Sequence, residues 1–142
     1  MRNVERILLV DDDEDFALLL KTAFDFAGFK GEILVVPDPR GALEHLNTRK
    51  AQRLPDLVLL DLQLHRGSGF DVLRSIRSQP ELNDVAVRVL TGIEAEGDAQ
   101  KAYQLGAQEY LVKPLEFSRL VEVAGRLRGE DEAEPRLAYS GD

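Results

Sequence analysis

Five mostly apolar runs, each followed by a stretch with helical periodicity, constrain the fold of this chain more than any other feature. The runs lie near residues 6–10, 33–36, 57–60, 85–90 and 109–112. Short apolar runs without polar alternation are typical of strands buried on both faces of a sheet. Strands that alternate with helices form a parallel sheet with helices on both of its faces. The sequence therefore predicts a doubly wound (βα)5 fold, a three-layer α/β sandwich.

The segments between these runs carry helix signals. The first predicted helix covers about residues 14–27 and is followed by Gly28, a residue type that commonly ends helices. The second follows Asp38-Pro39, which pairs an N-cap residue with a proline suited to the first turn. The third follows the capping-box pattern of Ser68–Asp71. The remaining helices are predicted over about 95–105, where the apolar stripe is weak, and 117–127.

Composition narrows the class of protein. A length of 142 residues fits one domain, and 44% hydrophobic with 31% charged residues is typical of soluble globular chains. No apolar run approaches the ~20 residues of a membrane helix, and the start lacks the apolar core of a signal peptide. A cytoplasmic protein without a membrane partner is therefore predicted. The net charge of −8 argues against direct binding of nucleic acid, and the lack of cysteine excludes disulfides.

The last residues of the chain have a different composition. Positions 129–142 carry one base, Arg136, little apolar content and five acids, namely Glu130, Asp131, Glu132, Glu134 and Asp142. Such a segment buries too little apolar surface to fold, so we predict a disordered acidic tail after a domain of residues 1–128. The start of the chain and this tail favour a complete protein without an output domain of its own.

Polar side chains follow four of the five predicted strands. Asp11 and Asp12 come after the first, Asp61 after the third, Thr91 after the fourth and Lys113 after the fifth. Because the carboxyl ends of parallel strands lie at the same edge of a sheet, we expect these side chains to be neighbours. The sequence thus predicts a site that combines carboxylates with a hydroxyl and an ammonium group.

This set of groups suits phosphoryl transfer. Close carboxylates resist ionising together, and a hard divalent cation such as Mg²⁺, which prefers oxygen ligands, relieves their repulsion. Lysine and threonine side chains can bind phosphoryl oxygens, and phosphoryl transfer depends mainly on such positioning and charge neutralisation. Aspartate is known to form a covalent aspartyl-phosphate, so Asp61 is the candidate nucleophile.

Four motifs carry a resemblance to a known family: Leu9–Asp12, Leu59–Asp61, Leu90–Gly92 and Val112–Pro114. In this order and spacing they resemble the receiver domain of two-component response regulators, similar to the single-domain chemotaxis type, over about residues 5–128. Gly69 fits a glycine that the family usually places after its phosphorylation site. The resemblance implies a flavodoxin-like, five-stranded parallel sheet of order 2-1-3-4-5.

The resemblance also implies roles for the site residues. Asp61 would accept a phosphoryl group from a histidine kinase or a histidine phosphotransfer protein. Asp12, Asp61 and the backbone carbonyl of Gln63 would ligate Mg²⁺ directly, and Asp11 would act on the metal mainly through water. The phosphoryl oxygens would be bound by Thr91 and Lys113.

Further implied features concern the output of the signal. Tyr110 matches the family's switch aromatic, which turns inward as Thr91 moves toward the phosphoryl group, although core packing explains a tyrosine here as well. Lys113-Pro114 would be a cis peptide bond. The downstream partner would bind the face formed by the fourth helix, fifth strand and fifth helix, and a homodimer is open.

Three positions depart from the family's usual pattern. His65 stands where the family often has proline, and we predict it to be a loop residue. Gln63 and Ile93 occupy the two variable positions that flank the phosphoryl group and tune its lifetime. None of these departures removes a group that the chemistry requires.

Two other functions compete with the phosphorylated switch. A receiver fold used as a binding module without phosphorylation would not need the complete set of site residues. A phosphatase of the haloacid-dehalogenase type also uses an aspartate nucleophile but carries a second aspartate two residues later, where this chain has Gln63. We therefore predict a signalling protein, not an enzyme.

Overall fold

One parallel sheet organises the molecule. The computed structural model describes residues 3–47 and 54–129. Its five-stranded sheet has the order β2-β1-β3-β6-β7. The strands are β1 (Arg6–Val10), β2 (Glu32–Val36), β3 (Leu57–Leu60), β6 (Ala86–Thr91) and β7 (Glu109–Val112), and every neighbouring pair is parallel. Counted along this sheet alone, the order is the predicted 2-1-3-4-5.

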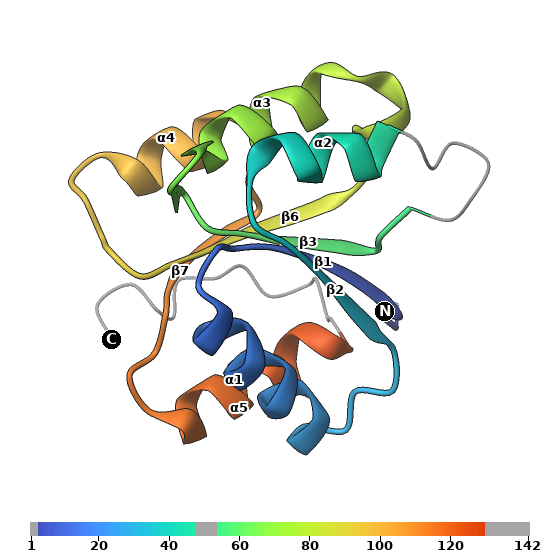
Figure 1. The fold of residues 1–142 in the computed structure, drawn as a ribbon, viewed down its shortest axis with the longest axis vertical. Coiled ribbons are helices and arrows are strands. Elements are labelled where there is room, and N and C mark those ends of the chain that lie inside the picture. The colour runs from blue at the N-terminus through green and yellow to red at the C-terminus, as the bar shows by residue number, and fades with distance from the viewer. Residues whose placement is uncertain (1–2, 48–53, 130–142) are drawn as a thin grey trace.

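Helices cover both faces of this sheet (Figure 1). The helices α1 (Glu14–Phe26) and α5 (Phe117–Arg128) lie on one face. On the other face lie α2 (Pro39–Asn47), α3 (Gly69–Ser78) and α4 (Asp98–Gln104), and a short 3₁₀ helix spans Pro80–Leu82. The prediction of a doubly wound three-layer α/β sandwich is therefore confirmed.

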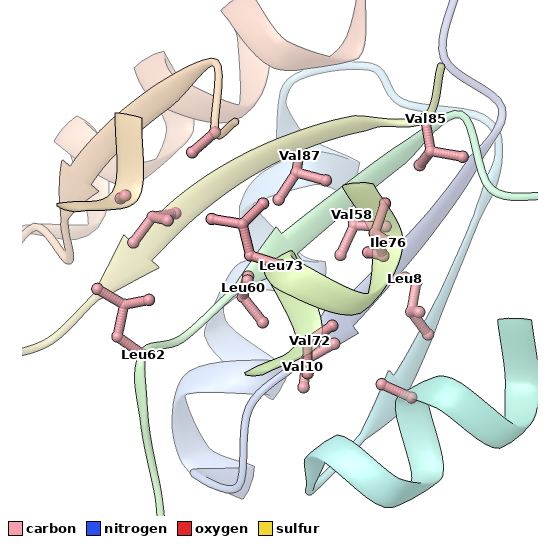
Figure 2. Close-up of a cluster of buried hydrophobic side chains, with 14 of the residues drawn as sticks. Leu8, Val10, Val58, Leu60, Leu62, Val72, Leu73, Ile76, Val85 and Val87 are labelled. Atoms are coloured by element: carbon pink, nitrogen blue, oxygen red, sulfur yellow. The ribbon is translucent and has the colours of Figure 1, made fainter. Parts of the chain in front are cut away.

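Two apolar cores explain why the strands read as continuous apolar runs. Side chains alternate across each strand, so Leu8 and Val10 point to the α2–α3–α4 face, while Ile7 and Leu9 point to the α1–α5 face. Figure 2 shows the first core, where the strand residues meet the buried face of α3. A sheet covered on both faces has no polar side in its central strands.

Two helix starts have the N-cap residues that the sequence predicts, Asp38 and Ser68, while the acid of the predicted capping box, Asp71, pairs with Arg74. Ser68 Oγ accepts a hydrogen bond from Phe70 N at 3.0 Å, and Asp38 Oδ1 accepts one from Gly41 N at 2.8 Å. Asp13 Oδ1 caps α1 by accepting from Phe16 N at 3.0 Å. These caps satisfy backbone donors that the first turn of a helix leaves without an intrahelical partner. Asp71 forms an ion pair with Arg74 at 3.0 Å.

Two features differ from the sequence-based expectations. The chain after β3 forms a small antiparallel ribbon of β4 (Gln63–Leu64) and β5 (Gly67–Ser68), too short to leave a periodic signal in the sequence. The predicted cis peptide bond at Lys113-Pro114 is wrong, because the described residues contain no cis peptide bond. Proline lowers the cost of the cis form, but the trans form of an X-Pro bond is still favoured by about 0.5–1 kcal/mol.

Two other expectations concern membrane-spanning helices and the acidic tail. No helix in residues 3–47 or 54–129 is both long and apolar enough to cross a membrane. The predicted acidic tail lies outside the described residues from position 130 onward.

Candidate functional site

The strand ends bring four of the predicted site residues into contact. Thr91 Oγ1 donates to Asp61 Oδ1 at 3.0 Å. Lys113 Nζ lies 3.2 Å from Asp61 Oδ2 and 2.9 Å from Asp11 Oδ2. All four side chains are largely buried. The expectation that these groups would be neighbours is therefore correct for Asp11, Asp61, Thr91 and Lys113.

Backbone hydrogen bonds place the two buried carboxylates. Asp61 N donates to Val10 O and Asp11 N donates to Val36 O, each at 3.0 Å, so the ladder of the sheet continues one residue beyond the strands. Each carboxylate then accepts a backbone N–H from two residues later: Asp11 Oδ1 from Asp13 N at 2.9 Å, and Asp61 Oδ1 from Gln63 N at 3.1 Å. These turns fix both side chains at the rim of the sheet.

Lys113 is the central cation of the site. Its backbone N donates to Thr91 O at 2.7 Å, and its Nζ lies 4.3 Å from the centre of the Phe16 ring. Burial by itself would lower the pKa of Lys113, but the contacts with Asp11 and Asp61 outweigh burial and raise it. Lys113 is therefore positively charged at neutral pH.

The surroundings of Asp11 disfavour the ionised form of its carboxyl group. Burial raises the pKa of its carboxyl group and outweighs the opposing contributions of Asp13 N and Lys113, while nearby Asp61 adds to the rise. The ionised form of Asp11 is thus less favourable in the folded protein than in the unfolded chain. An acidic site that is partly destabilised in this way favours an added cation.

Asp12 points to a different partner, which the sequence reasoning missed. Its Oδ2 accepts a hydrogen bond from His65 N at 2.6 Å, and His65 Nδ1 lies 2.6 Å from the same oxygen. Burial alone would raise the pKa of Asp12, but the contacts with His65 outweigh it and lower the pKa. His65 stands on the turn between β4 and β5, so its prediction as a loop residue is correct, and its contact with Asp12 adds it to the site.

These groups border an open pocket at the carboxyl edge of the sheet. Its volume is about 560 Å³, which is ample for a hydrated cation and a phosphoryl group. Its lining contains the flanking positions of the sequence analysis, the charged groups and the acidic start of α1: Asp12, Asp13, Glu14, Asp15, Asp61, Gln63, His65, Gly92, Ile93 and Lys113. A pocket of similar volume at the amino edge, between Arg6, Phe29 and Arg128, contains none of the predicted site residues.

The donor atoms in the pocket fit Mg²⁺. Within the part of the chain that the structure describes, no three His, Asp or Glu side chains are grouped as a protein-only metal cage. Mg²⁺ does not require one, because it keeps several waters and binds through one or two carboxylates plus phosphate oxygens. Asp12 and Asp61 supply such carboxylates in one pocket.

Tyr110 lies next to the site but inside the core. It is 3% exposed and packs in the apolar cluster beneath α3 and α4. Burial, together with Asp98 and Glu94, raises its pKa to about 12. Its backbone N donates to Tyr103 Oη of α4 at 3.1 Å, so the edge strand β7 is tied to α4 at this residue.

Replacing Asp11 with asparagine is expected to raise the free energy of unfolding at pH 7 by about 0.5–2 kcal/mol in metal-free buffer. The substitution removes a carboxylate whose pKa is raised on folding, and it keeps an oxygen for Asp13 N. Because the folded protein binds that proton more tightly, the contribution of this carboxyl group to the stability of wild type falls as the pH rises above 3.8, its ordinary pKa. The advantage of Asp11→Asn should therefore shrink as the pH falls toward that value.

Urea unfolding at several pH values measures this difference. The matched control is Asp15→Asn, which removes an exposed acid from the same acidic run and should not increase stability. A loss of stability in Asp11→Asn at pH 7 would contradict the expected cost of the ionised carboxylate.

Comparisons with known proteins agree with this site. The family model described as the response regulator receiver domain matches residues 7–124. The probable methanogenesis regulatory protein FilR2 of Methanothrix harundinacea is 38% identical over 116 residues, covering 80% of this chain and 75% of the relative. Among solved structures, the Mn²⁺-bound response regulator Rcp1 has a TM-score of 0.77 at 28% identity, and the phosphorylated cyanobacterial phytochrome response regulator RcpA has 0.79 at 30%. Each alignment covers 87% of this chain and 91% of the solved chain.

Some relatives are much longer. The chain spans about half the length of several curated transcriptional regulators that it matches, for example 47% of CpxR from Klebsiella pneumoniae. The shared part is therefore the domain that carries the site, and a match to the family model that extends over most of the sequence identifies it. The chain belongs to the response regulator receiver domains of two-component signalling.

Proposed function

We propose that Asp61 is the phosphoacceptor of this receiver domain and that its phosphorylation changes which protein the domain binds. The observation that carries the proposal is the contact of both Asp61 oxygens with phosphoryl-binding groups. Oδ1 meets Thr91 Oγ1 at 3.0 Å, and Oδ2 meets Lys113 Nζ at 3.2 Å. A phosphoryl group joined to either oxygen would find a hydroxyl donor and an ammonium group within reach.

The proposed reaction exchanges one bond to phosphorus for another. A carboxylate oxygen of Asp61 attacks the phosphorus of a phosphohistidine on a histidine kinase or a histidine phosphotransfer protein. The new O–P bond forms as the P–N bond breaks, and the leaving imidazole nitrogen takes a proton from solvent. Lys113 neutralises charge on the phosphoryl oxygens, and the Thr91 hydroxyl donates to one of them.

Mg²⁺ would be held by the carboxylates of Asp12 and Asp61 with the backbone carbonyl of Gln63, while Asp11 acts through water. When bound, the ion supplies positive charge for the phosphoryl oxygens. This set is supported by the oxygen donors at the pocket and by Mn²⁺ in the solved structure of Rcp1. The phosphorylated state of RcpA supports the same chemistry in a relative.

The output is a population shift between two conformations. Transfer of the Thr91 hydroxyl from Asp61 to a phosphoryl oxygen would alter the end of β6, and the buried Tyr110 on neighbouring β7 would respond as the switch residue. The affected surface is the α4–β7–α5 face, which exposes the apolar side chains of Tyr103 and Val112. Its partner is a downstream protein or a second copy of the chain, in the cytoplasm.

Phosphoryl uptake from a small donor tests the proposal. Wild type incubated with Mg²⁺ and acetyl phosphate should gain the mass of one phosphoryl group, and a chelator should prevent the gain. Asp61→Asn should show no gain, whereas Asp25→Asn, which changes an exposed acid near the far end of α1 and away from the pocket, should behave as wild type. An equal adduct on Asp61→Asn, or none on wild type, would overturn the proposal.

A further inference from the structure

His65 approaches Asp12 with two nitrogen atoms. Its backbone N and its ring Nδ1 each lie 2.6 Å from Asp12 Oδ2. The imidazole is 88% exposed and the Asp12 side chain 17%, so the ring lies over the mouth of the site. We propose that His65 is a nitrogen ligand of the divalent cation site, and that it shifts the ion preference of this domain from Mg²⁺ toward transition metals such as Ni²⁺. The inference rests on the proposed function, because it concerns the same cation site.

The backbone that carries His65 is fixed in place. The ribbon of β4 and β5 is closed by pairing of Gln63 with Ser68 and of Leu64 with Gly67. At its base, Gly69 N donates to Leu62 O at 3.0 Å. Gly67 has φ +142°, and a Cβ there would lie 2.9 Å from Pro39 Cγ at the start of α2. The packed turn thus holds the backbone of His65 beside Asp12, from where its imidazole reaches the carboxylate.

The two side-chain atoms already have nearly the separation of adjacent ligands. Nitrogen and oxygen ligands lie about 2.0–2.2 Å from metals such as Zn²⁺, so two ligands at a right angle are about 3 Å apart. His65 Nδ1 and Asp12 Oδ2 are 2.6 Å apart and need to open by only a few tenths of an ångström. Neutral imidazole binds metals through either ring nitrogen, so the tautomer with its proton on Nε2 presents Nδ1.

The type of donor decides which ions benefit. Carboxylates, carbonyls and water suit Mg²⁺, whereas imidazole suits Zn²⁺, Ni²⁺ and Cu²⁺. An Mg²⁺ ion bound to Asp12 and Asp61 would therefore gain little from His65, while Ni²⁺ would gain a favoured ligand. The described residues hold no preformed group of three such side chains, so Asp12, Asp61 and His65 would close around the ion as it binds, and water would occupy the remaining positions.

A simpler role for His65 predicts a different result. If the residue only restrains Asp12 through hydrogen bonds, its loss changes the affinity for every cation by a similar factor. If it is a ligand, its loss weakens the binding of ions that favour nitrogen and leaves Mg²⁺ little affected. The change in the ratio of the Ni²⁺ and Mg²⁺ dissociation constants between wild type and variant separates the two roles. A general preference of oxygen sites for Ni²⁺ is present in both proteins and cancels in this comparison.

Calorimetric titration of the whole chain with Ni²⁺ alone and Mg²⁺ alone tests the inference. We compare wild type, His65→Ala and the control His45→Ala, which removes the other histidine of the chain, on α2. The expected result is a loss of at least about 10-fold in Ni²⁺ affinity for His65→Ala, since even residues that only orient a ligand cost about 10–100-fold, with a much smaller change for Mg²⁺. His45→Ala should match wild type.

A spectroscopic measurement reports the ligand directly. Electron spin echo envelope modulation of the protein loaded with Cu²⁺, a paramagnetic ion that imidazole suits, should show the ¹⁴N modulation of a bound imidazole in wild type and His45→Ala but not in His65→Ala. The inference would be overturned if His65→Ala lost Ni²⁺ and Mg²⁺ affinity by the same factor or kept its Ni²⁺ affinity unchanged. Absence of ¹⁴N modulation in wild type would overturn it as well. None of these measurements uses a phosphodonor, so they fail independently of phosphoryl uptake.

Discussion

Glu109→Ala is expected to lower the free energy of unfolding by about 3–5 kcal/mol, the usual cost of removing one partner from a buried ion pair. Glu109 is fully buried between two arginines. Its Oε1 accepts from Arg88 Nη1 at 2.6 Å, and its two oxygens accept from Arg126 Nη1 at 3.1 Å and Nη2 at 2.8 Å. The substitution would take from Arg88, which is 8% exposed, the buried carboxylate that it contacts.

The cluster links three elements of the fold. Arg88 of β6 and Glu109 of β7 are cross-strand neighbours in the sheet, and Arg126 comes from α5. Loss of the carboxylate should therefore loosen α5 from the edge of the sheet as well as reduce stability. Amide hydrogen exchange should show earlier opening of α5 than of α3 in the variant.

Chemical denaturation measures the stability change, with Glu122→Ala as control. Glu122 lies on α5, the helix that carries Arg126, but its pair with Arg119 is exposed and spans 3.9 Å, so its loss should change stability little. The double variant Arg88→Leu/Glu109→Leu should recover part of the loss, because it removes both charges from the interface of β6 and β7. Similar losses for Glu109→Ala and Glu122→Ala would contradict the account of the cluster.

Gly69→Ala is expected to lower the free energy of unfolding by about 2–3 kcal/mol, within the usual cost of overpacking a tight site. A Cβ on Gly69 would lie 2.2 Å from Asp61 O and 2.9 Å from Leu62 Cα, so the backbone that carries Asp61 would have to shift. A displacement of about 1 Å at a reacting group can reduce its rate 100-fold, so phosphoryl uptake should also slow strongly.

A second glycine supplies the matched control. Gly125 lies within α5, and a Cβ there would make an ordinary contact of 3.8 Å with Ala27 Cβ. Gly125→Ala should keep phosphoryl uptake and gain about 0.5–1 kcal/mol of stability, because alanine is the better helix former. Normal uptake and stability in Gly69→Ala would show that the close approach to Asp61 has no consequence.

Much of the fold could be predicted because strands that are buried on both faces of the sheet appear in the sequence as continuous apolar runs. Central strands such as β3, Leu57–Leu60, contain no polar residue, and the polar residues that follow the strands mark the edge of the sheet. The contacts among Asp61, Thr91 and Lys113 then follow from the direction of the strands. Residues that follow different strands of a parallel sheet are therefore neighbours in space, even when they lie far apart in the sequence.

The features that were missed depend on register and on short turns. Arg88 and Glu109 interrupt predicted strands, and only the pairing of β6 with β7 shows that their charges meet. His65 reaches Asp12 through a ribbon whose strands have two residues each, too few for a periodic pattern. The trans bond at Lys113-Pro114 went against a family expectation that the sequence itself cannot test.

The position of the phosphoryl group tests the central claim most directly. After wild type reacts with acetyl phosphate and Mg²⁺, proteolysis and tandem mass spectrometry under conditions that preserve acyl phosphates locate the modified residue. We predict that the phosphoryl group is on Asp61 and that no modified peptide forms in Asp61→Asn. A phosphoryl group on Asp11, Asp12 or a histidine of wild type, with Asp61 unmodified, would contradict the account.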